Sequence, residues 1–248
     1  MKAVIFNSGL GNRMGDFTQT HHKSMSVLKN GETIFHRQLR LLSQEGIRDF
    51  VITTGPFEEQ LKAEAADFPQ LNFTFVRNEI YDKTNYIYSM YLAREAMKGD
   101  DLIFLHGDLV FNRKLVRDVL SCADKNTGTV NFSKALPEKD FKARVVDGKV
   151  MEVSIHIFDE NCFAFQPFYK MDVETAGAWI QKVEEFVAKD EVKCYAENAL
   201  NEIFAQLNIR AFSYEGYYID EIDNLDDYAR VTADIEPFDE ADAKLFGV

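Results

Sequence analysis

Short apolar runs alternate with amphipathic segments along the first hundred residues. The runs are rich in Val, Ile, Phe and Thr, as is typical of buried strands, and they span 2–6, 50–54 and 73–76. Between the first two, residues 32–45 carry apolar side chains at mixed i, i+4 and i+7 spacings, and Gly46 stands where a helix would end. Residues 57–66 form a second predicted helix. Strands that alternate with helices predict a parallel sheet.

Further along the chain the pattern changes. Residues 85–97 have helical periodicity and precede an apolar strand at 101–105. Shorter apolar runs then predict strands at 129–133, 143–146, 150–155 and 162–168, with a hairpin turn at Asp147-Gly148. The remaining predicted elements are helices at 173–189 and 196–207 and a strand near 209–214. The shorter strands indicate an antiparallel extension of the sheet.

These elements indicate an α/β fold: a single-domain, Rossmann-like, mixed but mainly parallel sheet flanked by helices, with a small antiparallel extension. A chain of 248 residues, 46% of them hydrophobic, can bury one large core. No Pro-, Gly- or Ser-rich linker and no repeat interrupts it. We therefore expect one domain over 1–236 and a charged, peripheral tail over 237–248, which would suit a linker to a fused partner domain.

Charge narrows the range of partners. The chain has 28 basic and 41 acidic residues, a formal net charge of −13, which argues against nucleic acid and against an anionic membrane as partner. Three cysteines with no C-x-x-C pair suggest neither disulfides nor zinc. A core strand begins at residue 2 and no signal-like or membrane-spanning run is present, so we expect a cytoplasmic protein. The oligomeric state stays open.

A glycine turn follows the first strand directly. Gly9-Leu10-Gly11 lets the backbone approach a polyanion and turn its N–H groups toward phosphate oxygens, while Arg13 and Lys23 add positive charge nearby. The turn lacks the third glycine of G-x-G-x-x-G, and no G-K-[ST] follows it. These departures argue against a dinucleotide-binding fold and against a P-loop. The glycines could also simply shape a strand-to-helix turn. With both cations in place, triphosphate binding is the better interpretation.

Acidic residues lie at two places that suit a metal. Asp108 follows the strand at 101–105, and ligands in open α/β sheets bind beyond the carboxyl ends of strands. Asp108 could instead cap a helix starting near Asn112. The run 220–227 includes Asp223, while Asp226 and Asp227 are better explained as cap residues of a following helix. His21 and His22 are expected to be solvated loop residues without a role.

Four segments together resemble one family, the nucleotidyltransferases with a glycosyltransferase-A-like Rossmann fold. Within it, the chain is similar to the small cytidylyltransferases that act on choline phosphate in bacteria or on 2-aminoethylphosphonate. The segments are G-L-G-x-R-M with Lys23-Ser24-Met25, Asn85 to Met90, Gly107-Asp108 and Glu221-Ile222-Asp223. Two departures are Asn7-Ser8-Gly9, where the family often has A-A-G, and His22-Lys23, where it often has P-K. The resemblance covers nearly the whole chain.

The resemblance implies transfer of CMP from CTP to an acceptor's phosphate or phosphonate oxygen, with release of pyrophosphate. The nucleophile is already an oxyanion, so no general base is needed. The implied triphosphate contacts are the backbone of Gly9, Leu10 and Gly11, with Arg13 and Lys23 as catalytic cations. Asp108 and Asp223 would ligate Mg²⁺. Cytosine contacts would come from Asn85, Ser89 and the turn at Gly55.

The acceptor is the least defined part of this hypothesis. Candidate acceptor residues are Tyr195, Glu197, Tyr218, Asp220 and Glu221. A quaternary ammonium favours an aromatic box, whereas a primary ammonium requires hydrogen-bond acceptors. Trp179 is the single tryptophan and lies away from every matching segment, which weakens a choline cage. Because the whole-chain pattern resembles the phosphonoalkyl cytidylyltransferases at least as well as the choline enzymes, we place 2-aminoethylphosphonate slightly ahead of phosphocholine.

Two alternatives remain open. A sugar-1-phosphate nucleotidyltransferase would share the glycine loop and the two aspartates, although Met14 to Thr18 only loosely matches the first-loop motif of those enzymes. A non-catalytic nucleotide sensor would retain the loop without turnover. The joint presence of Arg13, Lys23, Asp108 and Asp223 argues against a sensor, which has no need of the complete set.

Overall fold

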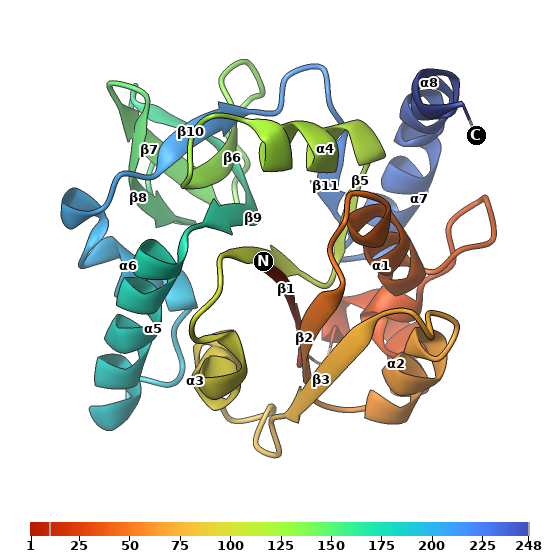
Figure 1. Cartoon of the computed structure of the whole chain (residues 1–248), viewed down its shortest axis with the longest axis horizontal. Coiled ribbons are helices and arrows are strands. Elements are labelled where there is room, and N and C mark those ends of the chain that lie inside the picture. The colour runs from red at the N-terminus through yellow and green to blue at the C-terminus, as the bar shows by residue number, and fades with distance from the viewer. Residues whose placement is uncertain (10, 248) are drawn as a thin grey trace.

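The computed structural model describes residues 1–9 and 11–247, with the backbone alone for residues 12, 13, 16 and 17. Within these residues, nine strands form one sheet in the order β3-β2-β1-β4-β9-β6-β10-β8-β7. Helices cover both faces of the sheet (Figure 1). The predicted fold class is confirmed.

The first four strands of that order form the parallel half. They are β3 (Asn72–Arg77), β2 (Asp49–Thr54), β1 (Lys2–Asn7) and β4 (Leu102–His106), and each pairs in parallel with its neighbour. Side chains of β1 alternate between the two faces, so that Ile5 packs with α1 (Ile34–Gln44) and α2 (Glu58–Ala65) while Val4 packs with α3 (Tyr86–Met97). Figure 1 shows α1 and α2 on one side of β1 and α3 on the other.

The second half of the sheet is built around β9 (Cys162–Met171), which runs antiparallel to both β4 and β6 (Thr127–Asn131). Beyond them lie β10 (Arg210–Ser213), β8 (Lys149–Ser154) and β7 (Lys142–Val146). Of the strands described, five lie in this part, and all their pairings except the parallel one between β6 and β10 are antiparallel. The extension is therefore larger than predicted. Helices α5 (Val173–Ala188) and α6 (Ala196–Asn201) pack on the same core as α3.

A second, two-stranded sheet was not predicted from the sequence. β5 (Leu109–Phe111) pairs antiparallel with β11 (Ile219–Glu221), and Ile222 N donates to Asp108 O at 3.1 Å just beyond the pairing. Three-residue strands carry too little periodicity to stand out in a sequence. The pairing brings the segment after residue 220 beside the carboxyl end of β4.

The remaining elements are short helical turns and helices at the rim. They are η1 (Asn12–Gln19), η2 (Lys23–Met25), α4 (Arg113–Ser121), η3 (Phe204–Gln206), α7 (Leu225–Asp234) and α8 (Glu236–Phe246). The helix predicted over 196–207 is thus α6 followed by η3. No helix in the described ranges 1–9 and 11–247 has both the length and the apolar character needed to span a membrane.

Helix α8 (Glu236–Phe246) is not peripheral, contrary to the prediction for the tail that begins at residue 237. Helix α8 is docked by Asp239, which accepts two hydrogen bonds from the buried Arg37 guanidinium at 2.9 and 2.5 Å. Asp242 is buried and accepts from Asn112 Nδ2 at 3.1 Å and from Lys114 N at 3.2 Å. Charged residues suggested solvent exposure because the sequence does not reveal their partners on α1 and α4.

Gly107 provides a test of the close packing beside the carboxyl end of β4. A Cβ at this position would lie 1.7 Å from the Oδ1 atom of the buried Asn7 side chain. We expect Gly107→Ala to lower the free energy of unfolding by about 1–3 kcal/mol, the usual cost of overpacking. Urea denaturation followed by circular dichroism measures this change.

Gly177 is the matched control, because it lies in α5 and an added Cβ would meet nothing within 4 Å. Gly177→Ala should raise the free energy of unfolding by about 0.5–1 kcal/mol through its helix propensity. Equal effects of the two substitutions would contradict the packing described at Gly107.

Candidate active site

The glycine turn lies at the carboxyl end of β1 and forms one wall of a pocket of about 340 Å³. Gly11 has φ of 64°, and a Cβ there would lie 3.0 Å from Lys23 Cβ and 3.1 Å from Thr18 Cγ2. Both the left-handed backbone and the close approach favour glycine. Leu10 lies outside the described residues, as does the Arg13 side chain, whose backbone is part of η1.

Lys23 lies at the centre of the site. Its Nζ donates to Asp108 Oδ2 at 2.5 Å and to Asp223 Oδ1 at 2.8 Å, and all three side chains are no more than 16% exposed. Burial alone would lower the pKa of Lys23, but the charges of Asp108 and Asp223 outweigh it and raise that pKa. This ammonium thus joins three segments that are far apart in the sequence.

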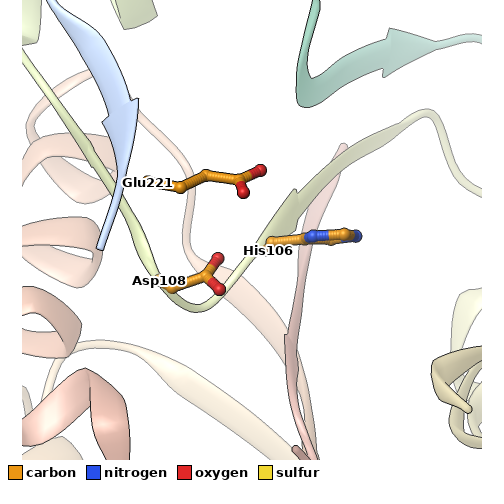
Figure 2. A group of neighbouring side chains, drawn as sticks. All are labelled: His106, Asp108 and Glu221. Atoms are coloured by element: carbon orange, nitrogen blue, oxygen red, sulfur yellow. The ribbon is translucent and has the colours of Figure 1, made fainter. Parts of the chain in front are cut away.

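More carboxylates meet here than one ammonium can neutralise. His106, Asp108 and Glu221 place ligand-type atoms within 4.8 Å of one another, and so do Asp140, Glu221 and Asp223. Figure 2 shows Asp108, in the turn between β4 and β5, and Glu221, at the end of β11, extending into the same space. Burial, followed by the charges of Asp108, Asp223 and Asp140, raises the pKa of Glu221 well above its usual value. The clustered carboxylates therefore make the site suited to a cation.

Asp108 retains capacity for such a cation. Its Oδ1 atom is buried and has no hydrogen-bond partner among the described residues. Asp108 does not cap a helix, because it precedes β5, and the N-cap position of α4 is taken by Asn112. Among the described side chains, four carboxylates line the pocket, from Asp108, Asp140, Glu221 and Asp223. An all-oxygen donor set of this kind suits Mg²⁺.

Aromatic rings form another wall of the pocket. The Tyr86 ring lies 5.0 Å from Phe6, 4.8 Å from His106 and 6.4 Å from Tyr195, measured between centroids. Phe141 continues the wall at 5.0 Å from Tyr195. These contacts create an apolar, electron-rich surface a short distance from the carboxylates.

Glu197 supports this wall from behind. The carboxylate is buried and accepts hydrogen bonds from the hydroxyl of Tyr86 and from Tyr169 Oη, the latter at 3.1 Å. Burial, followed by the charge of Glu197, raises the pKa of both tyrosines well above the usual value. Glu197 therefore fixes the ring of Tyr86 and does not itself line the pocket.

A loop that the sequence analysis left without a role completes the site. Lys139, Asp140 and Phe141 line the pocket. The buried Lys142 holds this loop, because its Nζ donates to Pro137 O at 2.8 Å and to Asp140 O at 3.1 Å. No motif marks these residues, and a lysine in a strand gives no sign that it binds backbone carbonyls.

Most of the residues proposed from the sequence converge on this pocket. Those that line it are Gly9, Gly11, Lys23, Asn85, Asp108, Tyr195, Glu221 and Asp223. Asn85 also caps α3, since its side chain accepts from Tyr86 N at 2.7 Å. The carboxyl ends of β1 and β4 and the residues after β11 thus form one site.

Other proposed residues lie behind or beside the pocket. Ser89 is buried and bonds to Ser8 Oγ at 2.6 Å and to Asn78 Nδ2 at 3.0 Å. At Gly55 the backbone passes so close to the loop that an added Cβ would lie 2.4 Å from Ser8 O. Both residues therefore support the loop that carries Ser8.

Two proposed acceptor residues are placed away from the pocket. Tyr218 packs 5.4 Å from Phe238 in a separate apolar cluster beneath α7 and α8. The Asp220 carboxylate binds Arg230 and, at 3.3 Å, Lys134 Nζ. Alternation along β11 explains this, because neighbouring side chains point to opposite faces and only Glu221 lines the pocket.

The prediction that His22 is a solvated loop residue is wrong. His22 is buried and not solvated, and its Nε2 lies 2.7 Å from Asn7 O, while Ser24 N donates to its Nδ1 at 3.2 Å. The Nε2–H tautomer satisfies both contacts. Burial lowers the pKa of His22 to about 4, so the ring is neutral near pH 7. His22 thereby ties the turn before Lys23 to the end of β1.

Comparisons with known proteins agree with this geometry. Residues 3–141 match the family model of the MobA-like NTP transferase domain. Choline-phosphate cytidylyltransferase of Haemophilus influenzae is 28% identical over 238 residues, 96% of this chain and 98% of that protein. CMP-5'-(3-aminopropyl)phosphonate synthase of Streptomyces rubellomurinus is 29% identical over 112 residues, 45% of this chain and 18% of that protein.

Solved structures share the fold. That of CTP:phosphocholine cytidylyltransferase from Streptococcus pneumoniae has a TM-score of 0.77 at 20% sequence identity and covers 95% of this chain and 99% of that one. At this level of identity the likeness establishes the architecture of the sheet and helices. The chemistry of the site depends on the residues themselves.

The burial of His22 predicts a pH dependence of stability. Its pKa is 6.5 when unfolded and about 4 when folded, so the unfolded chain binds the extra proton first as the pH falls. The free energy of unfolding should therefore decrease between pH 6.5 and pH 4, by about 3 kcal/mol from this group. Urea titrations at a series of pH values measure the slope.

His22→Gln should flatten the slope over this range, and His21→Gln, at the exposed neighbour, should leave it in place. An unchanged slope in His22→Gln would contradict a buried, neutral His22.

Proposed function

Because this chain belongs to the MobA-like NTP transferase domain family, we propose that it is a cytidylyltransferase that transfers CMP from CTP to a small cationic acceptor bearing a phosphate or phosphonate. The observation that carries the proposal is the cluster of Lys23, Asp108 and Asp223 at the end of the glycine turn. The choice of CTP is supported by the names of the full-length relative and of the phosphonate synthase.

Catalysis of this reaction requires positioning of the two substrates and stabilisation of negative charge on the phosphates, more than it requires proton transfer. An acceptor oxyanion attacks the α-phosphorus of CTP in line with the leaving pyrophosphate, so no general base is required. The backbone N–H groups of Gly9, Leu10 and Gly11 would hold the triphosphate, and Arg13 would offset charge on the pyrophosphate. Lys23 would stabilise charge on the α-phosphate, since its ammonium faces the pocket.

Asp108 and Asp223 would hold Mg²⁺. The fit rests on the unpartnered Oδ1 of Asp108 and on the excess of carboxylates over ammonium groups. When bound, the ion would supply positive charge to the phosphate oxygens. Lys23 holds the two carboxylates together in advance, because its Nζ bonds to both. Burial and the neighbouring carboxylates raise the pKa of both Glu221 and Asp140, and a cation bound beside them would favour their charged forms.

Recognition of cytosine would fall to the side of the pocket next to α3. Asn85 lines the pocket at the start of this helix and can contact the base directly. Ser89 would act through Ser8, to which it bonds at 2.6 Å. Gly55 would allow the close approach of Ser8 to the neighbouring strand end.

The aromatic wall indicates which chemical class of acceptor the pocket favours. Phe6, Tyr86, Phe141 and Tyr195 present ring faces and edges beside the pocket carboxylates Asp140 and Glu221. This combination suits a quaternary ammonium, which offers no hydrogen-bond donor and is held by rings and by nearby negative charge. We therefore place phosphocholine ahead of 2-aminoethylphosphonate, which reverses the narrow preference drawn from the sequence.

A panel of substrates tests the proposal. Pyrophosphate release should be measured with each of the four ribonucleoside triphosphates against phosphocholine, 2-aminoethylphosphonate and glucose-1-phosphate, with and without Mg²⁺. We expect turnover with CTP and phosphocholine, weaker turnover with 2-aminoethylphosphonate, and loss of both without Mg²⁺.

Turnover confined to glucose-1-phosphate would overturn the proposal in favour of a sugar-1-phosphate nucleotidyltransferase. Nucleotide binding without pyrophosphate release from any pair would favour a sensor. A preference for 2-aminoethylphosphonate would contradict only the choice of acceptor.

The proposed metal ligands give a second prediction. Asp108→Ala and Asp223→Ala should each lower kcat roughly 10²–10³-fold, the scale seen when one preorganised electrostatic contact is removed. Both variants should keep the circular dichroism spectrum of the unmodified protein. Asp226→Ala is the matched control, since Asp226 is an exposed residue of the first turn of α7, and it should keep full activity. Near-normal rates in either pocket variant would exclude the metal assignment.

A further inference from the structure

A second cavity of about 350 Å³ lies at the other end of the sheet from the active site. Its lining includes Met1 and Asp101, which precede β1 and β4, together with Cys122 and Lys170. Cys122 follows α4 and is half-buried, and Lys170 lies on β9 and is only 5% exposed. The cavity thus brings a thiol and a buried amine together far from the CTP pocket.

The two side chains contact each other directly. Lys170 Nζ lies 3.1 Å from Cys122 Sγ and 3.1 Å from Cys122 O. Across residues 1–9 and 11–247, both of the hydrogen-bond acceptors found for Lys170 Nζ belong to Cys122. Burying an ammonium is costly unless a partner offsets its charge, so the sulfur is held close to the nitrogen.

Two of the carboxylates that line the cavity accept hydrogen bonds from backbone N–H groups. Asp172 accepts from Thr175 N at 2.9 Å as the N-cap of α5, and Asp101 accepts from Val173 N at 2.9 Å. Within the described residues, no hydrogen bond or ion pair joins either carboxylate to Lys170. The amine nitrogen and the sulfur remain the two reactive atoms at this point of the cavity.

We propose that Cys122 and Lys170 form an oxidation-sensitive pair, which a small peroxide that enters the cavity converts into a sulfur–nitrogen cross-link. Hydrogen peroxide oxidises the thiol to a sulfenic acid and is reduced to water. The Lys170 nitrogen then attacks the sulfur, the S–N bond forms, and the hydroxyl leaves as water. The ammonium gives one proton to this water and one to solvent, and the residues together lose two hydrogen atoms.

The 3.1 Å separation is what makes this condensation intramolecular. A sulfenic acid normally needs a second nucleophile to arrive, whereas here the amine already lies against the sulfur. The cross-link would join the end of α4 to β9, and like other cross-links it would restrict the unfolded chain. It does not rest on the proposed function, because neither residue lines the active-site pocket.

Intact-mass and peptide-mapping mass spectrometry of the protein treated with hydrogen peroxide tests the proposal. We expect a species lacking two hydrogen atoms, a peptide that joins Cys122 to Lys170, and restoration of the original mass by dithiothreitol. Thermal unfolding should show a Tm that rises on oxidation and falls back on reduction. Cys122→Ser should abolish all these changes.

Cys194 provides the matched control, since it is also half-buried and its sulfur donates to Glu191 O. Cys194→Ser should leave the cross-link in place, and Lys170→Gln should stop at a sulfenic acid that dimedone traps. A wild-type protein that gives a dimedone adduct at Cys122 but no linked peptide would overturn the proposal, as would a linked peptide that retains the oxygen atom. Because the wild-type result alone decides, the test holds even where a Lys170 variant does not fold.

Discussion

One ammonium group organises the active site. Lys23 Nζ contacts Asp108 and Asp223, and it thereby joins η2, the turn after β4 and the segment after β11. Without Lys23, two partly buried carboxylates would face each other with no positive charge between them. Removing one partner of a buried ion pair typically costs about 3–5 kcal/mol, so this contact also supports the local fold.

The surroundings of Lys23 are arranged to keep it in place. His22, the preceding residue, is buried and bonded to Asn7 O, and Gly11 packs against the Lys23 side chain. Another wall of the pocket is aromatic, and there Glu197 accepts a hydrogen bond from the hydroxyl of Tyr86. The pocket therefore has a charged half that suits phosphate chemistry and an apolar half that suits a bulky cationic group.

The parts of the fold that could be predicted are those whose strands and helices leave a clear hydrophobic pattern in the local sequence. The parallel half of the sheet follows from apolar runs and helical periodicity, and Asp108 stands where a strand ends. Asp223 was identified by resemblance to a family and not by periodicity, because β11 has only three residues.

Other features depend on contacts that no local pattern encodes. Asp140 is positioned by a hydrogen bond from Lys142 Nζ to its backbone carbonyl. His22 is positioned by its contact with Asn7 O at the end of β1. Helix α8 appeared peripheral because its partner Arg37 lies some two hundred positions earlier in the chain. Tyr218 was misplaced for a simpler reason, since its orientation depends on the register of β11 against β5.

The pairing of β5 with β11 also sets the order in which the site can come into existence. Asp223 reaches Lys23 only after β11 has paired with β5, and the two residues are 200 positions apart. During synthesis on the ribosome, the glycine turn and Asp108 emerge long before their partner. A nascent chain that has folded its parallel half therefore still lacks one of the two carboxylates at Lys23, and the cluster is complete only when the segment after β11 has emerged.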